Sequence, residues 1–125
     1  MTEADAQDFA LEWIAAWNSH DLDRILRHYT EDVEVTSPLV EAVLGPGATT
    51  LRGKPAVRQY WQQALARYPD LHFVLFRAYA GPRSLVLHYR SVQALVGAEC
   101  LELDEAGRVY RGLAHYALGP DPAAA

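Results

Sequence analysis

Apolar side chains near the start of the chain recur at the spacing of an α-helix. They lie three, four and seven positions apart, so one face of a first helix is predicted to be buried. Thr2 and Asp5 fit a capping box at the start of this helix. A second short helix is predicted after Asp21, which has the residue type of an N-cap. The apolar positions are Phe9, Ala10, Trp13 and Trp17 in the first helix, and Leu22, Ile25, Leu26 and Tyr29 in the second.

The spacing then changes to alternation. Val33, Val35 and Ser37 alternate with polar residues, which predicts a strand that carries Ser37 on its apolar side and ends at Pro38. Residues 39–53 contain three glycines and show no clean period. We therefore expect a loop there, placed so that it can act as a flap over a cavity.

The second half of the chain predicts one more helix and a series of strands. Proline favours the first turn of a helix, so a third helix is expected from Gly53-Lys54-Pro55 to Tyr68-Pro69. Four strands are expected at about 71–79, 84–92, 95–103 and 108–118, with turns between them. Helices followed by a strand meander indicate an α+β fold, with the helices on one face of a largely antiparallel sheet.

Size and composition restrict the possibilities further. A chain of 125 residues, half of them hydrophobic, is expected to form one domain over 1–118, with a loose tail at 119–125. The formal net charge of -5 has the wrong sign for a nucleic-acid surface. No membrane segment or metal-ligand set is expected, and a lone Cys100 fits a reducing, cytoplasmic setting.

Five stretches of the chain resemble the SnoaL-like and ketosteroid-isomerase-like branch of the nuclear transport factor 2-like superfamily. They are WIAAWNSHDLDRIL (13–26), YTEDVEV (29–35), LRGKPAVR (51–58), LDEAGRV (103–109) and AHY (114–116). The resemblance covers nearly the whole chain. It implies a cone of three helices wrapped by a curved sheet, a deep pocket, and a homodimer formed through the outer face of the sheet. Functions in this superfamily range from isomerases and cyclases to dehydratases and epoxide hydrolases, so the fold does not specify the reaction.

The resemblance also places the three catalytic positions of the steroid isomerases. The general base corresponds to Ser37, the phenol to Trp13 and the protonated acid to Glu99. A serine hydroxyl needs an activating neighbour to act as a base, and an indole N–H is a poorer partner for negative charge than a phenol. Steroid isomerisation by that route is therefore not expected.

Glu99 is the strongest catalytic candidate. It shares one face of its predicted strand with apolar residues, so burial would raise its pKa and suit it to proton transfer. The alternatives are a solvated carboxylate or an ion pair with Arg90 or Arg111.

Aromatic residues are the candidate ligand contacts. We expect Trp13, Trp17, Tyr29, Trp61, Tyr89 and Tyr116 to line the pocket. Core packing explains the tryptophans, Tyr29 and Tyr60 equally well, and a backbone partner would explain Tyr89 and Tyr116.

The sequence is compatible with three functions. The chain is an isomerase, cyclase or dehydratase that needs no cofactor, with Glu99 as acid or base and Ser37, Tyr89 or Trp13 orienting an oxygen. Alternatively it binds a small hydrophobic molecule without turnover. In a third interpretation, it is a dimeric interaction module that uses the outer sheet face, with Val86, His88, Arg90 and Val92. A glycine-rich phosphate loop is missing from the sequence, so no cofactor is implied.

Overall fold

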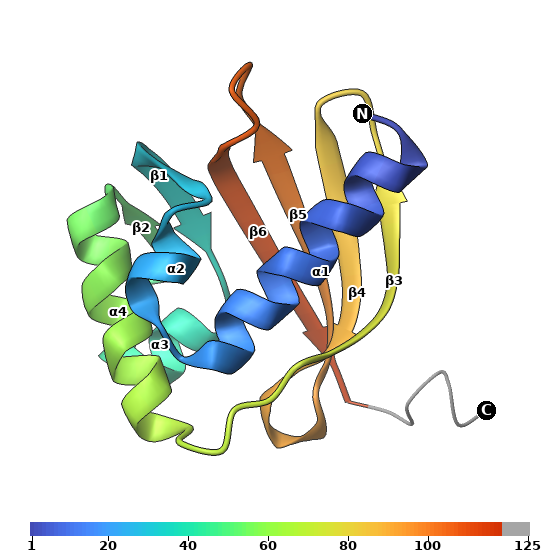
Figure 1. Cartoon of the computed structure of the whole chain (residues 1–125). Helices are drawn as coiled ribbons and strands as arrows, with labels where there is room; N and C mark the ends of the chain where they lie inside the picture. The colour runs from blue at the N-terminus through green and yellow to red at the C-terminus, as the bar shows by residue number, and fades with distance from the viewer. Residues whose placement is uncertain (119–125) are drawn as a thin grey trace.

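Helices pack on one face of a curved six-stranded sheet (Figure 1). The computed structural model describes residues 1–118, and the expected tail at 119–125 lies outside them. Within the described residues the sheet stays open, with strand order β2-β1-β6-β5-β4-β3. The helices are α1 (Glu3–Ser19), α2 (Leu22–Leu26), α3 (Leu39–Leu44) and α4 (Lys54–Arg67), with a 3₁₀ turn η1 (Val92–Ala94). The strands are β1 (Tyr29–Thr36), β2 (Thr50–Arg52), β3 (Val74–Ala80), β4 (Ser84–Arg90), β5 (Val96–Leu103) and β6 (Val109–Ala117).

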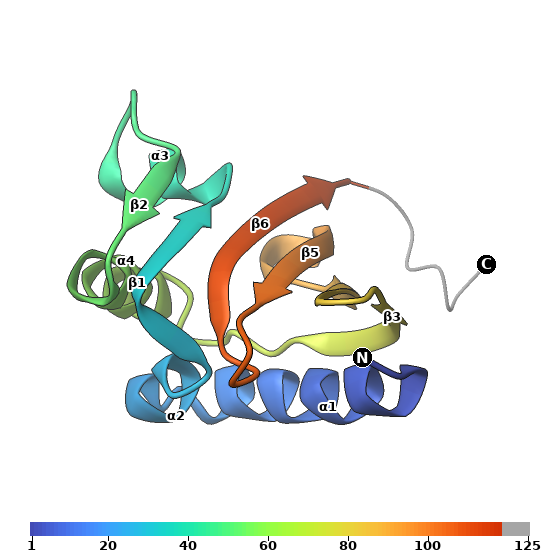
Figure 2. The same cartoon turned by 90° about the horizontal axis from the view of Figure 1, so that it is seen from above.

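Strand pairing confirms the expected α+β fold. Strands β3 to β6 form an antiparallel meander, and β2 is antiparallel to β1. Only the pairing of β1 with β6 is parallel among the described strands. Figure 2 shows the sheet bending while α1 and α2 run along one side of it.

The first helix forms as its sequence predicts. The Thr2 and Asp5 side chains cap each other's backbone N–H groups at 3.0 Å, so the capping box is confirmed. The buried face carries small residues alternating with Trp13 and Trp17, which lets α1 lie close to β3. No helix in the described part of the chain is long and apolar enough to cross a membrane.

Residues 39–53 are more regular than expected. They contain helix α3 and strand β2, which makes four α-helices over residues 1–118 where three were predicted. Strand β2 pairs with β1, with Val35 opposite Leu51, so its backbone is held at the sheet edge. Gly45 and Gly47 connect the two elements at φ of 105° and 98°, a region that glycine enters without strain. Each element is short, and short elements give little periodicity to detect.

Three other boundaries differ from the sequence prediction. Tyr29 begins β1 rather than continuing the second helix. Strand β3 begins at Val74 instead of Leu71, because the backbone of Phe73 is hydrogen-bonded to the Asn18 side chain and not to a neighbouring strand. The Phe73 N–H donates to Asn18 Oδ1 at 2.7 Å, and Asn18 Nδ2 donates to the Phe73 carbonyl at 2.9 Å. Val92 lies in η1, beyond the end of β4.

Candidate functional site

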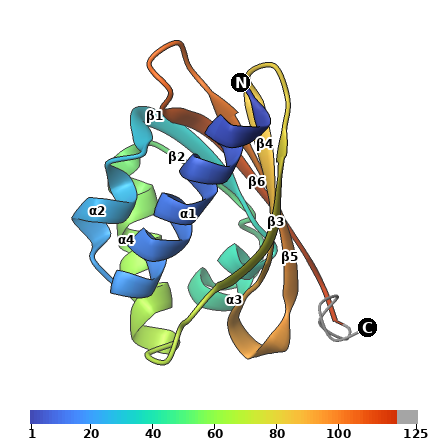
Figure 3. The same ribbon diagram turned by 45° about the vertical axis from the view of Figure 1, so that its right-hand side comes forward.

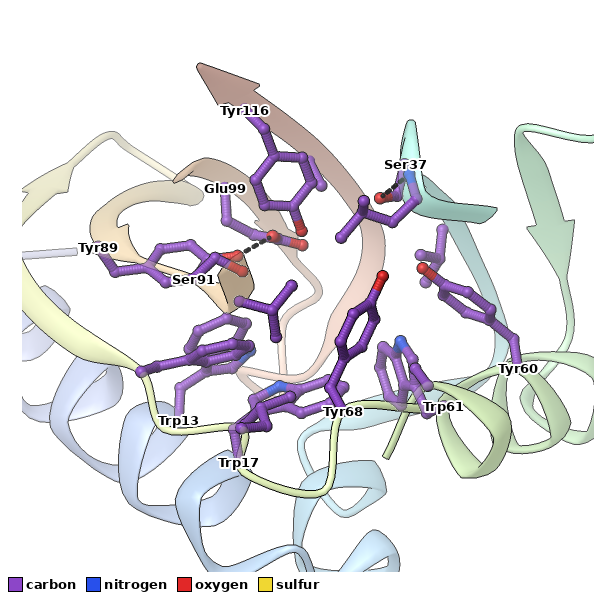
Figure 4. Close-up of a pocket in the computed structure, with 17 residues that line it drawn as sticks. Trp13, Trp17, Ser37, Tyr60, Trp61, Tyr68, Tyr89, Ser91, Glu99 and Tyr116 are labelled. Atoms are coloured by element: carbon purple, nitrogen blue, oxygen red, sulfur yellow. Dashed lines mark hydrogen bonds between the residues drawn. The ribbon is translucent and has the colours of Figure 1, made fainter. Parts of the chain in front are cut away.

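A cavity lies between the helices and the concave face of the sheet, and its wall is mostly aromatic (Figure 4). Its empty volume is about 560 Å³ when the open mouth is counted. Residues of α3 and of the β4–β5 loop, two segments that lie at the same end of the sheet in Figure 3, contribute to its wall. The residues in its wall are Trp13, Trp17, Val35, Ser37, Leu39, Tyr60, Trp61, Ala64, Tyr68, Leu71, Phe73, Tyr89, Ser91, Val92, Glu99, Ala114 and Tyr116.

Glu99 is the one carboxylate that residues 1–118 contribute to this wall. It projects from β5 and is 8% exposed. Burial raises the pKa of Glu99 to about 7, and a hydrogen bond from the Tyr89 hydroxyl, 3.1 Å from Oε1, acts in the opposite direction. A carboxyl group with this pKa is present both as acid and as base near neutral pH.

The neighbouring strands explain why Glu99 is buried. Its register partners are Leu87 in β4 and Ala114 in β6, both apolar and buried. A Cβ placed on Gly112 would lie 3.9 Å from Glu99 Oε2, so the glycine keeps that side of the carboxyl open. Arg111 pairs with Glu102 on the other face, at 3.8 Å, and not with Glu99. Neither the solvated carboxylate nor the ion pair with Arg111 is found.

Tyr89 and Tyr116 flank Glu99 and meet over Gly97. A Cβ on Gly97 would lie 2.9 Å from two atoms of the Tyr89 ring and 3.3 Å from the Tyr116 ring, so these rings need a residue without a side chain. Burial, and then the charge of Glu99, raise the pKa of both phenols. Both hydroxyls are therefore protonated donors at neutral pH. Figure 4 shows the Tyr116 hydroxyl directed towards Glu99.

Trp13 presents its ring to the cavity but uses its N–H elsewhere. The indole Nε1 donates to the Tyr29 hydroxyl at 2.8 Å, and both groups are buried. In this structure the Trp13 N–H is thus not directed at a ligand oxygen. Tyr29 itself stands behind the cavity wall, in edge contact with Trp61 at 4.9 Å between ring centroids.

Trp17 lies in the cavity wall as expected, packed against Trp61 with ring centroids 5.0 Å apart. Its buried Nε1 has no hydrogen-bond partner among the described residues. Burial raises the pKa of Tyr29, and the N–H groups of Trp13 and Trp17 act against this shift, so the Trp17 N–H lies on the Tyr29 side.

Ser37 lies just after β1, at the edge of the cavity, and is 4% exposed. Its Oγ accepts a hydrogen bond from the Leu39 N–H at 3.2 Å. Burial raises the pKa of Tyr60 to about 12, and the neighbouring Ser37 hydroxyl partly offsets this. The neighbours of Ser37 are thus hydroxyl and backbone groups, which do not activate it as a base.

Several wall residues were not among the predicted ligand contacts. Tyr60 lies within α4, Tyr68 is the C-cap residue of that helix, and Ser91 follows β4. Val92 was expected on the outer sheet face, but it is 8% exposed and lines the cavity, because the chain turns inward in η1. Tyr60 adjoins Trp61 in the helical pattern, a signal that indicates a buried face but not a cavity.

Comparisons with known proteins agree with this fold. The family model of the SnoaL-like domain matches residues 10–119. A SnoaL-like protein of unknown function from Burkholderia thailandensis is 44% identical, with a TM-score of 0.87 over 94% of this chain and 98% of the other. No match was found among curated proteins.

More distant structures share the fold only. A candidate isomerase of the SnoaL-like family from Agrobacterium tumefaciens str. C58 is 17% identical, with a TM-score of 0.73 over 91% of this chain and 98% of the other. The epoxide hydrolase/cyclase-like enzyme SalBIII, described with pyran ring formation in the polyether salinomycin, is 16% identical, with a TM-score of 0.72 over 92% of each chain. The family model and the 44% identical structure together show that this chain belongs to the SnoaL-like family.

Proposed function

We propose that this protein binds a small, largely apolar molecule in the aromatic cavity and that Glu99 transfers a proton to or from it. The single observation that carries the proposal is the placement of Glu99. Among the described residues it is the only carboxyl group in the cavity wall, and burial raises its pKa to about 7. A perturbed acid inside a cavity is a physical reason to suspect catalysis.

The reaction that fits this group is a proton shift next to a carbonyl. The Glu99 carboxylate takes a proton from the carbon beside the carbonyl, and the electrons of that C–H bond move to the carbonyl oxygen to give an enolate. The protonated Glu99 then returns the proton to another atom, which gives an isomer. This cycle balances without a cofactor or a second reactant.

The phenols beside Glu99 support the same chemistry. Tyr89 and Tyr116 stay protonated at neutral pH because burial and the charge of Glu99 raise their pKa values. A protonated phenol can stabilise a developing enolate oxygen by a hydrogen bond in a site that excludes water. Glu99 is therefore proposed as acid or base, with Tyr89 and Tyr116 as donors.

A ligand binder without turnover is the second candidate. Ser37 occupies the position where the steroid isomerases of this superfamily have their base, and its neighbours do not activate it. If Glu99 serves only to donate a hydrogen bond, the same cavity binds a molecule and releases it unchanged. A homodimer through the outer face of the sheet is proposed with either function.

Hydrogen–deuterium exchange at the α-carbon of 1-indanone tests the first candidate. The wild-type protein is expected to accelerate exchange in D₂O, with a rate that rises as the pH passes about 7 and the Glu99 carboxylate forms. The Glu99→Gln variant is expected to lose about 100-fold or more of this acceleration, the usual contribution of a general base. Glu102→Gln on the opposite face of β5 is the matched control. Saturable binding of 1-indanone with equal exchange in both variants would favour the binder instead.

A further inference from the structure

Helix α4 brings three hydrogen-bond donors to the side of the cavity opposite Glu99. Tyr60 and Trp61 are consecutive residues of the helix, 5% and 6% exposed, and Tyr68 is its C-cap residue. In Figure 4 the hydroxyls of Tyr60 and Tyr68 and the indole nitrogen of Trp61 point into the same part of the cavity. Glu99, Tyr89 and Tyr116 lie on the other side.

Two of these three donors have no acceptor within the described part of the chain. The Trp61 Nε1 and the Tyr68 hydroxyl make no hydrogen bond there, whereas the Tyr60 hydroxyl lies beside the Ser37 hydroxyl, which can accept a hydrogen bond. An indole N–H can donate a hydrogen bond but the nitrogen cannot accept one, so it pairs only with an acceptor. A donor that faces a cavity is paired with whatever enters that cavity, so the unpaired donors of this wall are matched to an acceptor there.

The charges of the wall restrict what this acceptor can be. Among the described residues, the wall contains no lysine, arginine or histidine. A carboxylate or phosphate placed there would be buried without a counter-ion and would repel the Glu99 carboxylate, which is unfavourable. A carbonyl or ether oxygen accepts the same hydrogen bonds without carrying a charge.

We infer that Tyr60, Trp61 and Tyr68 form a subsite for an uncharged acceptor oxygen at the end of the ligand remote from Glu99. The inference rests on the proposed function in one respect, that the cavity holds a small molecule. It then specifies the molecule: a neutral compound with an apolar middle, an atom that reacts at Glu99, and a carbonyl or ether oxygen at its far end.

Two probe compounds of the same shape test the subsite. Both 5-acetyl-1-indanone and 5-isopropyl-1-indanone carry the same ketone, but only the first has an acceptor oxygen on its second substituent. Their affinities are measured by calorimetry for the wild-type protein and for a Tyr60→Phe/Tyr68→Phe double variant. The readout is the ratio of the two dissociation constants, which cancels changes common to both probes.

We expect the preference for the acetyl compound to fall by about tenfold in the double variant, the effect of losing one to two neutral hydrogen bonds. Trp61→Phe is expected to lower it by about threefold to tenfold for the same reason. Tyr110→Phe, an exposed tyrosine outside the cavity wall, is the matched control and should leave the ratio unchanged. If the double variant unfolds, the single Tyr68→Phe variant replaces it, because Tyr68 is only half-buried.

The inference is overturned if the ratio is the same in wild type and in the Tyr60, Trp61 and Tyr68 variants, or if neither probe binds. It is also overturned if the ratio falls in Glu99→Gln and not in the α4 variants, since the acetyl oxygen would then lie at the acid. The proposed proton transfer fails differently. In that case Glu99→Gln leaves the exchange of 1-indanone unchanged, while the affinity ratio still falls in the α4 variants.

Discussion

Replacing Glu99 by glutamine should change how the stability of the protein depends on pH. Burial raises the pKa of Glu99 from its ordinary value of 4.5 to about 7 in the folded state. Between these two values the folded protein binds a proton that the unfolded chain does not. The contribution of Glu99 to stability is therefore fully present below about pH 4.5 and is lost as the pH rises through about 7.

The size of the effect follows from the shift. A difference of about 2.5 pKa units corresponds to about 3 kcal/mol, at about 1.4 kcal/mol per unit. Glutamine resembles the protonated acid in shape and still offers an oxygen to the Tyr89 hydroxyl, but it cannot ionise. The free energy of unfolding of Glu99→Gln, relative to wild type, should thus rise by about 3 kcal/mol between pH 4.5 and pH 8.

Urea unfolding at four pH values across this range measures the difference. The comparison between the two proteins removes the contributions of all other titrating groups that they share. Glu12, for example, has its pKa lowered to about 2 by hydrogen bonding to Arg24, and it titrates identically in both. Glu102→Gln is the control, because its side chain is partly exposed and pairs with Arg111.

A difference in stability that stays constant with pH, within about 0.5 kcal/mol, would refute the argument. It would mean that the Glu99 carboxylate is hydrated in the folded state and that its pKa is ordinary. A difference that changes in the opposite direction would mean that the cavity stabilises the carboxylate, and the group would then be too weak a base for the proposed chemistry.

Three further predictions follow from contacts in the same region. Gly97→Ala should destabilise the fold by about 1–3 kcal/mol in urea unfolding, because its Cβ would overlap the Tyr89 ring, and a loss below about 0.5 kcal/mol would contradict this packing. Asn18→Ala should cost about 2–3 kcal/mol, since it leaves the backbone N–H and carbonyl of Phe73 without their partner, and an unchanged melting temperature would show that water replaces the side chain. Light scattering should give twice the chain mass of 13.9 kDa if the outer sheet face forms a homodimer, and a mass of 13.9 kDa would exclude it.

The sequence predicted the long elements well because each contains enough residues to show a period. Helix α1 begins at its capping box, and strands β4, β5 and β6 lie within two residues of their predicted bounds. Helix α3 and strand β2 have six and three residues, fewer than two turns or two full alternations, so their sequence predicts a loop. Tyr29 was assigned to a helix because position 29 fits both the spacing of the helix before it and the strand after it.

Alternation along β5 placed Glu99 on an apolar face, and the structure buries it there. The partners of polar groups could not be predicted in this way, because they depend on residues far apart in the chain. Trp13 and Tyr29 are 16 positions apart, and their hydrogen bond turns the indole nitrogen away from the cavity. The inward turn of Val92 likewise depends on the β4–β5 loop, where Gln93 and Ala94 take left-handed conformations that no sequence signal marks.

The same aromatic pattern predicts a packed core and a ligand cavity, and burial alone does not separate the two. Whether the N–H groups of the aromatic side chains are hydrogen-bonded within the protein does separate them. Trp13 belongs to the core in this sense, because its N–H is satisfied by Tyr29 within the protein. Trp61 is equally buried, yet its N–H faces the cavity without an acceptor among the described residues. A donor that faces the cavity is available to a ligand, whereas one satisfied inside the protein is not, so the tryptophan on α4 is the better evidence that this cavity is meant to be filled.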